Sequence, residues 1–86
     1  MVKQIFSLFD KKACAYTQPF FYDQPGQAVR ALDGIVNNAE TQVAKYPEDF
    51  ALYKLGTFDD NSGELIKLSE PEFLHNSVDF LKTTKD

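Results

Sequence analysis

Two runs of alternating apolar residues joined by a short polar turn constrain the fold of this chain most. The first run is "FALYKLGTF", residues 50–58, and the second is "ELIKLS", residues 64–69. A period of two residues is typical of β-strands, because successive side chains point to opposite faces of a sheet. Acidic, amide and glycine residues lie between the runs. The pattern therefore predicts a β-hairpin over residues 50–69.

The polar turn also contains a spacing that suggests a calcium-binding loop, with Asp59, Asn61 and Gly63 two residues apart. Such a loop needs oxygen ligands at its first, third and fifth positions, glycine at the sixth and a bidentate glutamate at the twelfth. Counted from Asp59, the fifth position is Gly63, the sixth is Glu64, and Glu70 alone fits the end of the pattern. We therefore interpret the stretch as a hairpin tip that Gly63 closes with a positive φ, and we expect no metal there.

The first quarter of the chain is expected to be extended. "VKQIFSLF", residues 2–9, has apolar groups on both sides of its alternation, which predicts an inner strand buried on much of both faces. "ACAYTQPFFYD", residues 13–23, is rich in aromatic residues and contains Pro19, which cannot donate a ladder hydrogen bond. This segment is either an edge strand or an irregular extended arm.

Residues 25–38 are predicted to form an amphipathic helix. Pro25 suits the first helical turn and follows the candidate caps Asp23 and Gln24. Gly34 inside the helix costs about 1 kcal/mol relative to alanine, which indicates either close packing or a weak helix. The apolar residues that recur at helical spacing are Ala28, Val29, Leu32, Ile35, Val36 and Ala39.

Two interpretations remain open for the end of the chain. Ser69 and Glu72 have the spacing of a capping box, and Pro71 lies early in the segment, which favours a short C-terminal helix. Alternatively, an irregular segment places Phe73 and Phe80 in the core. We expect about the last four or five residues to be frayed.

Together these elements predict an α+β fold over residues 1–86 as a single domain. A small antiparallel sheet, built from an N-terminal strand or pair and the C-terminal hairpin, packs on one main helix. No run of about 18 apolar residues is present, and the N-terminus does not read as a secretory signal, so a soluble intracellular protein is expected. A chain this small buries its surface incompletely, which favours a homodimer that covers a sheet edge or an aromatic patch.

The sequence offers little for catalysis. Cys14 and His75 are the single cysteine and histidine, they lie far apart in sequence, and no third residue is identifiable that would orient them. The four glycines are dispersed, so no phosphate-binding loop is present. We expect neither an enzyme nor a cofactor.

The formal net charge of −4 bears on the choice of partner. Proteins that bind nucleic acid usually have a surplus of Lys and Arg to neutralise phosphates, whereas this chain has a deficit. Lys3, Lys11, Lys12 and Arg30, the only arginine, still give the N-terminal part a basic bias. This bias is either an ordinary solvated surface, which is the favoured interpretation, or a local phosphate site.

Aromatic residues follow the two neighbouring lysines Lys11 and Lys12, and sites for single-stranded nucleic acid combine stacking rings with nearby cations. A short chain also needs such rings for its core, and this competing role remains open. We assign core roles to most of Phe6, Phe9, Phe20, Phe50 and Phe58. The exposed candidates are Tyr16, Phe21, Tyr22 and Tyr53.

Several motifs occur in an order that resembles a known family. These are "IFSLFDKKACAY" with "PFF", then "AVRALDGIVNN", then "YPEDFALYKLGTFDDNSGEL". Over about residues 3–68 they resemble the small nonstructural proteins of gokushoviruses, single-stranded DNA bacteriophages of the microvirus group (Microviridae). The most specific part is the Pro47 to Asp59 segment together with Gly63.

The resemblance implies a role in viral DNA replication and packaging in the host bacterial cytoplasm. It implies a DNA-binding counterpart of the microvirus protein that switches replication to single-stranded genome synthesis and packaging. The corresponding partners are single-stranded DNA and viral replication or procapsid proteins. A protein–protein adaptor that never binds DNA is the alternative, and the charge balance favours it. The candidate DNA contacts are Lys11, Lys12, Tyr16, Tyr22 and Arg30.

Overall fold

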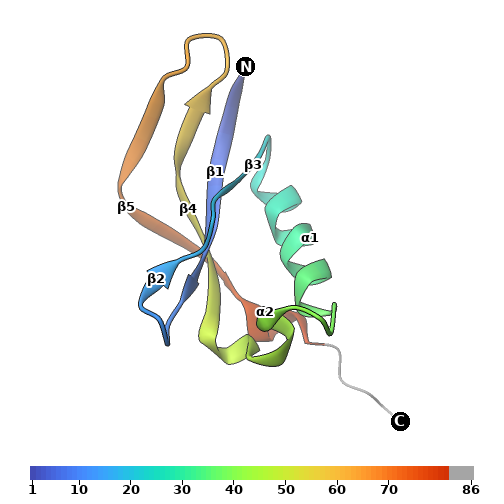
Figure 1. Ribbon diagram of the computed structural model, residues 1–86. Coiled ribbons are helices and arrows are strands. Elements are labelled where there is room, and N and C mark those ends of the chain that lie inside the picture. Colours follow the sequence, from blue (N-terminus) through green and yellow to red (C-terminus); the bar gives the residue numbers. More distant parts are fainter. Residues whose placement is uncertain (82–86) are drawn as a thin grey trace.

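The computed structural model describes residues 1–81 and shows a twisted antiparallel sheet with one main helix against one of its faces (Figure 1). The sheet order is β2-β1-β4-β5, and β3 pairs with the same edge of β1 as β2 does. The elements are β1 (Val2–Asp10), β2 (Ala15–Tyr16), β3 (Phe20–Tyr22), α1 (Pro25–Val36), α2 (Gln42–Lys45), η1 (Pro47–Asp49), β4 (Phe50–Asp59), β5 (Leu65–Asn76) and η2 (Ser77–Phe80). The predicted α+β class is confirmed.

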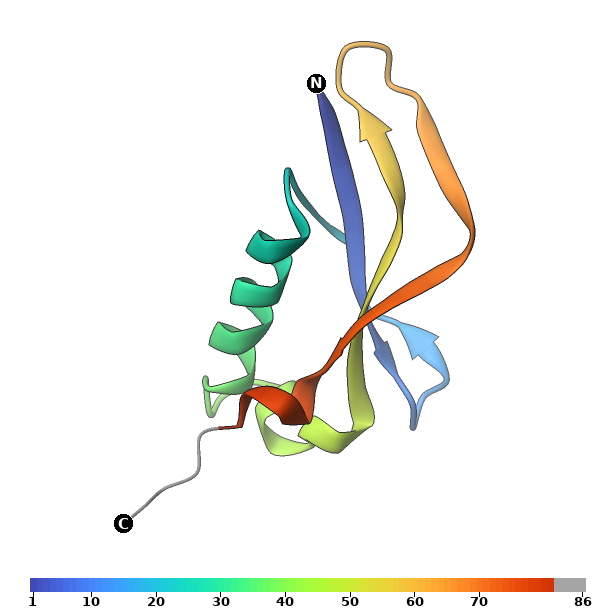
Figure 2. The same ribbon diagram turned by 180° about the vertical axis from the view of Figure 1, so that it is seen from behind.

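β1 is an inner strand, as its sequence predicted, and its alternation separates the two faces of the sheet. Phe6 and Leu8 are buried on the face that α1 covers, where Leu32 of the helix is also fully buried. From behind, the helix lies along one side of the sheet, and the other face has no helix (Figure 2). We call these the helix-covered face and the helix-free face. The buried hydrophobic cluster of the helix-covered face comprises Phe6, Leu8, Ala28, Leu32, Val36, Val43, Phe50 and Leu52.

Helix α1 begins where the sequence indicated and ends two residues earlier than predicted. The N-cap is Gln24, whose backbone N–H donates to Oε1 of Gln27 at 2.9 Å, and Pro25 occupies the first turn. The helix stops at Val36 because the next turn is closed by Asn37, whose side-chain amide donates to the Asp33 carbonyl at 2.9 Å. A Cβ on Gly34 would meet nothing within 4 Å, which excludes close packing as the reason for this glycine.

The extended segment after β1 forms two short strands. β2 and β3 both pair with β1, and the break between them contains Pro19, which fits the edge position that the sequence predicted. Thr17 holds this break against the sheet: its backbone N–H donates to the Leu8 carbonyl at 2.8 Å, and its carbonyl accepts from Oγ of the buried Ser7 at 2.7 Å.

The predicted hairpin is present, but its second strand runs to Asn76 rather than Ser69. The predicted C-terminal helix is therefore wrong over residues 69–76, and the helical part is the short 3-10 helix η2. The capping-box spacing did not lead to a helix, because this segment pairs with β4 instead. β4 is ten residues long, and the backbone groups of its first half need hydrogen-bonding partners, which the segment with Phe73 and His75 supplies. Phe80 packs against the core, whereas Phe73 is half exposed. The predicted frayed end lies outside the described residues.

Irregular pairing bends both hairpin strands in the middle. Ile5 pairs with Gly56 and Phe6 with Lys54, so Leu55 is an extra residue in β4. At the edge of β4 that faces β5, Lys54 pairs with Glu72 and Gly56 with Lys67. Residues 68–71 of β5 therefore bow away from β4, as Figure 1 shows. Pro71 lies in this unpaired part, where its missing N–H costs no ladder hydrogen bond.

The tip of the hairpin is closed by local hydrogen bonds. Oδ1 of Asp59 accepts the Asn61 N–H at 2.9 Å, the Gly63 N–H donates to the Asp59 carbonyl at 2.7 Å, and Gly63 has a φ of +80°. The predicted positive φ at Gly63 is confirmed. The Asn61 N–H, assisted by the nearby terminal ammonium and by Ser62, lowers the pKa of the Asp59 carboxyl from its ordinary value.

This pKa shift predicts a pH dependence of stability. Because the folded-state pKa of Asp59 lies below its unfolded value, its contribution is complete above the unfolded pKa and is lost as pH falls through the folded pKa. Asp59→Asn keeps the acceptor oxygen but cannot titrate, so it should lose less stability than the wild type between about pH 5 and pH 2. Urea unfolding at both pH values tests this, and equal losses in the two proteins would contradict it.

Candidate nucleic-acid interface

Aromatic side chains from four strands meet on the helix-free face. In β1, Phe9 has the opposite parity to Phe6 and therefore points away from the helix. Phe9 pairs with Tyr16, Tyr53 pairs with Ser7 on this same face, and Phe73 pairs with Tyr53. The segments that supply the rings are β1, β2, β4 and β5, so the sheet register alone brings these side chains together.

The four rings are in contact. The ring centroids of Phe9 and Tyr16 are 4.9 Å apart, those of Tyr16 and Tyr53 are 5.9 Å apart, and those of Tyr53 and Phe73 are 5.7 Å apart. Tyr16 is 42% exposed and Phe73 is 50% exposed, while Phe9 and Tyr53 are half-buried between them. We call Phe9, Tyr16, Tyr53 and Phe73 the aromatic cluster. Its rings offer a partly exposed surface on which flat groups can stack.

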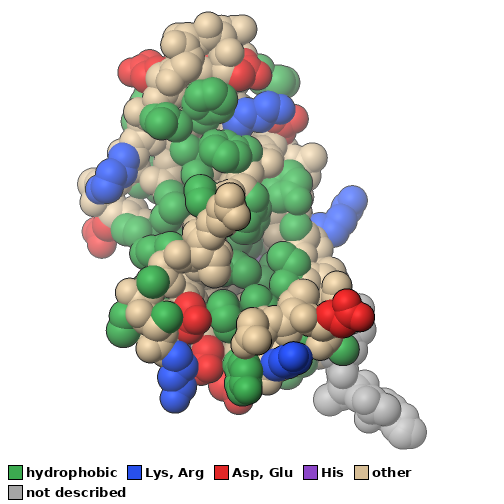
Figure 3. Space-filling model, viewed as in Figure 1, with side chains coloured by type: hydrophobic (Ala, Val, Ile, Leu, Met, Phe, Trp, Pro, Cys, Tyr) green, Lys and Arg blue, Asp and Glu red, His purple; other side chains and the backbone are tan. Residues whose placement is uncertain are grey.

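A second aromatic pair extends this face toward the hairpin tip. Phe21 of β3 pairs with Ile5, and its ring centroid lies 5.9 Å from that of Phe58, which pairs with Lys3. Phe21 is 46% exposed. In the view of Figure 3, hydrophobic side chains gather along the middle of the molecule, and most charged side chains lie around this area.

Three lysines accompany the helix-free face. Lys67 pairs with Gly56 and therefore projects on this face, whereas Lys11 and Lys12 are exposed in the turn that follows β1. The turn is ordered by Asp10, whose Oδ1 accepts the backbone N–H of Lys12 at 3.0 Å. Lys67 therefore supplies positive charge on this face. Lys11 and Lys12 lie at the end of the molecule next to the aromatic cluster, where the Nζ of Lys11 is 3.5 Å from the Glu48 carbonyl oxygen and Lys12 lines a pocket with Asp49.

Lys3 also projects on the helix-free face, opposite Phe58, but its charge is already paired. Its Nζ lies 2.9 Å from Oδ1 of Asp23. The hydrogen bond and the charge of Asp23 raise the pKa of the Lys3 ammonium. Lys3 is therefore less suited to a phosphate than the three other lysines are.

The five candidate DNA contacts do not form one surface. Lys11, Lys12 and Tyr16 lie at the same end of β1, near the aromatic cluster. Tyr22 instead lies on the helix-covered face, where its ring centroid is 6.5 Å from that of Phe6, and Arg30 is exposed on α1.

The predicted roles of the phenylalanines hold in part. Phe6 and Phe50 are buried in the core, and Phe20 packs against it, as expected. Phe9 and Phe58 are only partly buried and lie on the helix-free face, so most but not all of the five belong to the core. The face of Phe9 could not be read from the sequence because β1 is apolar on both sides, whereas Phe58 lies in β4 beyond the extra residue Leu55.

Phe73 is a further member of this surface that the sequence did not predict. It was placed in a C-terminal helix or in the core, whereas β5 carries it onto the helix-free face. The only sequence signal was weak: the run "EFLHN" is compatible with an extended strand once "FALYK" needs a partner.

Cys14 and His75 each have local surroundings that explain them. Cys14 occupies the β1–β2 turn with a φ of 55°, and its Sγ lies 3.5 Å from the Lys11 carbonyl oxygen. His75 lies on the helix-covered face against Phe80, and its Nδ1 is 3.9 Å from Oδ2 of Asp79. Within residues 1–81, no three His, Cys, Asp or Glu side chains gather as ligands for a metal ion.

The fold and this surface define a small two-layer α+β protein whose sheet presents partly exposed rings on one face. The chain belongs to the phage ORF5 protein family, whose family model matches residues 3–80. Neither a curated protein nor a solved structure matches the chain. None of the helices among residues 1–81 has the length and apolar character needed to cross a membrane.

Proposed function

We propose that this phage protein is a nonstructural protein of single-stranded DNA genome replication and packaging in the host cytoplasm, and that it binds single-stranded DNA without catalysis. The observation that carries the proposal is the aromatic cluster on the helix-free face, with Tyr16 and Phe73 each about half exposed. Membership of a phage family and the resemblance to gokushovirus nonstructural proteins agree with it.

The chemistry of the surface suits an unpaired strand. Unstacked bases have flat π faces that can lie on the Tyr16 and Phe73 rings, and each such contact contributes about 1–3 kcal/mol. Bases in a duplex are already stacked on one another, so the same rings would bind duplex DNA much more weakly. The supporting β-strands are rigid, so little conformational entropy is lost when a base stacks.

Electrostatics should set the strength and the salt dependence of binding. Lys11, Lys12 and Lys67 are placed to contact phosphates beside the rings, while the overall charge of −4 repels them. Three phosphate contacts to a single strand give a slope of about −2 for log affinity against log salt concentration. We therefore expect modest affinity that is clearest at low salt.

The proposal predicts a loss of affinity for single strands when the exposed rings are removed. Tyr16→Ala and Phe73→Ala should each weaken binding of a labelled oligo(dT) by about 5- to 150-fold, which corresponds to the loss of one stacked base. Fluorescence anisotropy at low and at physiological salt measures this change. A duplex oligonucleotide measured in parallel should bind more weakly than the single strand.

Tyr46→Ala is the matched control, because Tyr46 is 54% exposed but lies outside the sheet, between α2 and η1. It removes an exposed tyrosine ring and should leave the affinity for oligo(dT) unchanged. Circular dichroism should show that all three variants remain folded. Unchanged affinity in both Tyr16→Ala and Phe73→Ala would reject stacking on this face.

A protein–protein adaptor that does not bind DNA is the second candidate. The acidic net charge favours it, because the chain would meet basic surfaces of replication or procapsid proteins more readily than phosphates. Absence of oligonucleotide binding at low salt would select this candidate over the first. The mass of the free protein in the same samples would test the predicted homodimer.

A further inference from the structure

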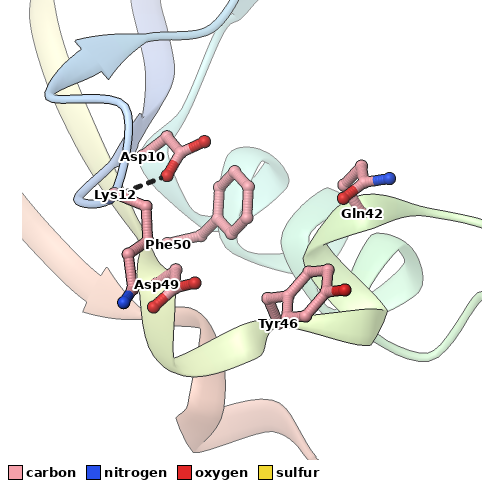
Figure 4. Close-up of a pocket in the computed structure, with 6 residues that line it drawn as sticks. All are labelled: Asp10, Lys12, Gln42, Tyr46, Asp49 and Phe50. Carbon is pink, nitrogen blue, oxygen red and sulfur yellow. Dashed lines mark hydrogen bonds between the residues drawn. The ribbon is translucent and has the colours of Figure 1, made fainter.

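A pocket lies at the end of the molecule where the β1–β2 turn meets α2 and η1. It has a volume of about 410 Å³, and its lining residues come from β1, the β1–β2 turn, α2, η1 and β4. In Figure 4 the Phe50 ring lies in the middle of this group, with acidic and basic side chains on one side of it and an amide and a tyrosine on the other. The lining residues are Asp10, Lys12, Gln42, Tyr46, Asp49 and Phe50.

The pocket combines an apolar floor, an aromatic wall and two carboxylates. Phe50 is 6% exposed, and its ring lies in the middle of the lining residues and forms the floor (Figure 4). The Tyr46 ring is more than half exposed and stands at the rim. Asp10 uses Oδ1 to hold the turn, and no hydrogen bond or ion pair within residues 1–81 involves the carboxylate of Asp49. Two carboxylates and one lysine line the pocket, so its formal charge is negative.

Backbone hydrogen bonds fix the walls of the pocket in place. The Lys11 N–H donates to the Asp49 carbonyl at 2.8 Å, which ties the β1–β2 turn to η1. The Asp49 N–H donates to the Tyr46 carbonyl at 3.0 Å. Tyr46 and Asp49 therefore have a fixed separation along the chain, and binding would require little rearrangement of the backbone.

We propose that this pocket binds an arginine side chain from a basic segment of a protein partner. A guanidinium group is planar and cationic, so it can stack on the Tyr46 ring while its N–H groups donate to the Asp49 and Asp10 carboxylates. The methylene stem would lie against Phe50. The occupant follows from charge complementarity, since both the pocket and the chain are net acidic. The pocket contains no residue of the aromatic cluster, but it shares Lys12 with the proposed DNA contacts.

Lys12 distinguishes an arginine site from an anion site. Its ammonium at the rim would repel a guanidinium and attract a phosphate. Removing this charge should therefore strengthen the binding of a cation and weaken the binding of an anion, which gives opposite signs for the two kinds of occupant.

The test is a titration followed by backbone amide NMR shifts of the whole protein. The probe is acetyl-Gly-Arg-Gly-amide, and acetyl-Gly-Gln-Gly-amide is the matched neutral peptide. The arginine peptide should shift the signals of Gln42, Tyr46 and Asp49 saturably with millimolar or tighter affinity, of the order expected for one small side chain. Tyr46→Ala and Asp49→Asn should each weaken this binding at least about fivefold, and Lys12→Ala should strengthen it about two- to fivefold.

Several outcomes would overturn the inference. Equal shifts with the glutamine peptide would show that charge is not recognised, and unchanged affinity in Asp49→Asn would remove the carboxylate from the site. Shifts of the pocket signals by deoxyguanosine monophosphate that weaken in Lys12→Ala, with none from the arginine peptide, would assign the pocket to an anion. Tyr16→Ala should not alter arginine binding, because Tyr16 does not line the pocket. If the arginine peptide does not bind while Tyr16→Ala still weakens oligo(dT) binding, the pocket proposal fails and the DNA proposal stands. Lys12→Ala is expected to affect both, because Lys12 belongs to both surfaces.

Discussion

Phe6→Ala is expected to give the largest loss of stability among the substitutions proposed for this protein. Phe6 is fully buried at the centre of the hydrophobic cluster, with its ring centroid 6.2 Å from that of Phe20 and 6.5 Å from that of Tyr22. Truncation of a buried phenylalanine costs about 3–5 kcal/mol, because apolar area is lost and a cavity remains. Small domains have only about 5–15 kcal/mol in total, so the variant should be partly unfolded at 25 °C or close to it.

Urea unfolding followed by circular dichroism or tyrosine fluorescence measures this effect, since the chain has four tyrosines and no tryptophan. Phe73→Ala is the control, because it removes the same side chain from a half-exposed position on the other face. Phe73→Ala should lower the free energy of unfolding by about 1 kcal/mol, as expected for a partly buried side chain. A Phe6→Ala variant as stable as Phe73→Ala would mean that the core does not lie between β1 and α1.

Gly56→Val should give the second largest loss. Gly56 lies directly after the extra residue Leu55 of β4, and a Cβ at this position would overlap the Ile66 carbonyl group of β5. The neighbour is backbone, which cannot rotate away as a side chain can, so the two strands would have to separate locally. Overpacking of this kind costs about 1–3 kcal/mol, and the larger β-branched side chain should reach the upper end of that range. Urea unfolding gives the free-energy difference.

Gly34→Ala is the matched glycine control. Gly34 lies inside α1, and a Cβ there would meet nothing within 4 Å. Because alanine favours the helix and restricts the unfolded chain, this substitution should stabilise the protein by about 0.5–1 kcal/mol. The two glycine substitutions should therefore shift the urea midpoint in opposite directions. Destabilisation by both would indicate that the close approach of β4 and β5 at Gly56 is not the cause.

Elements whose signals are local in sequence were the ones that could be predicted. The 50–58 run alternates well enough for a strand, the turn contains Gly63, and the segment from Pro25 has helical spacing with a cap. Each of these signals depends on neighbours within a few residues, so no tertiary information was needed.

The C-terminal segment shows why other elements could not be predicted. Ser69, Pro71 and Glu72 carry a helix-start pattern, yet the structure makes them part of β5. Hydrogen bonding to β4 competes with the local preference, because unpaired backbone groups next to a core are costly. Whether Phe73 pairs with Tyr53 or begins a helix is decided by a contact across 20 residues, and a propensity pattern does not contain that information.

The sequence by itself determined a small α+β chain with an inner N-terminal strand, a main helix after Pro25 and a hairpin that turns at Gly63. Only the tertiary structure decided which side of β1 the helix covers, and therefore that Phe9, Tyr16, Tyr53 and Phe73 share the open face while Tyr22 and Arg30 lie elsewhere. The physical reason is that a strand apolar on both sides does not specify its buried face. The packing of α1 and the strand register assign that face, and with it the surface available for binding.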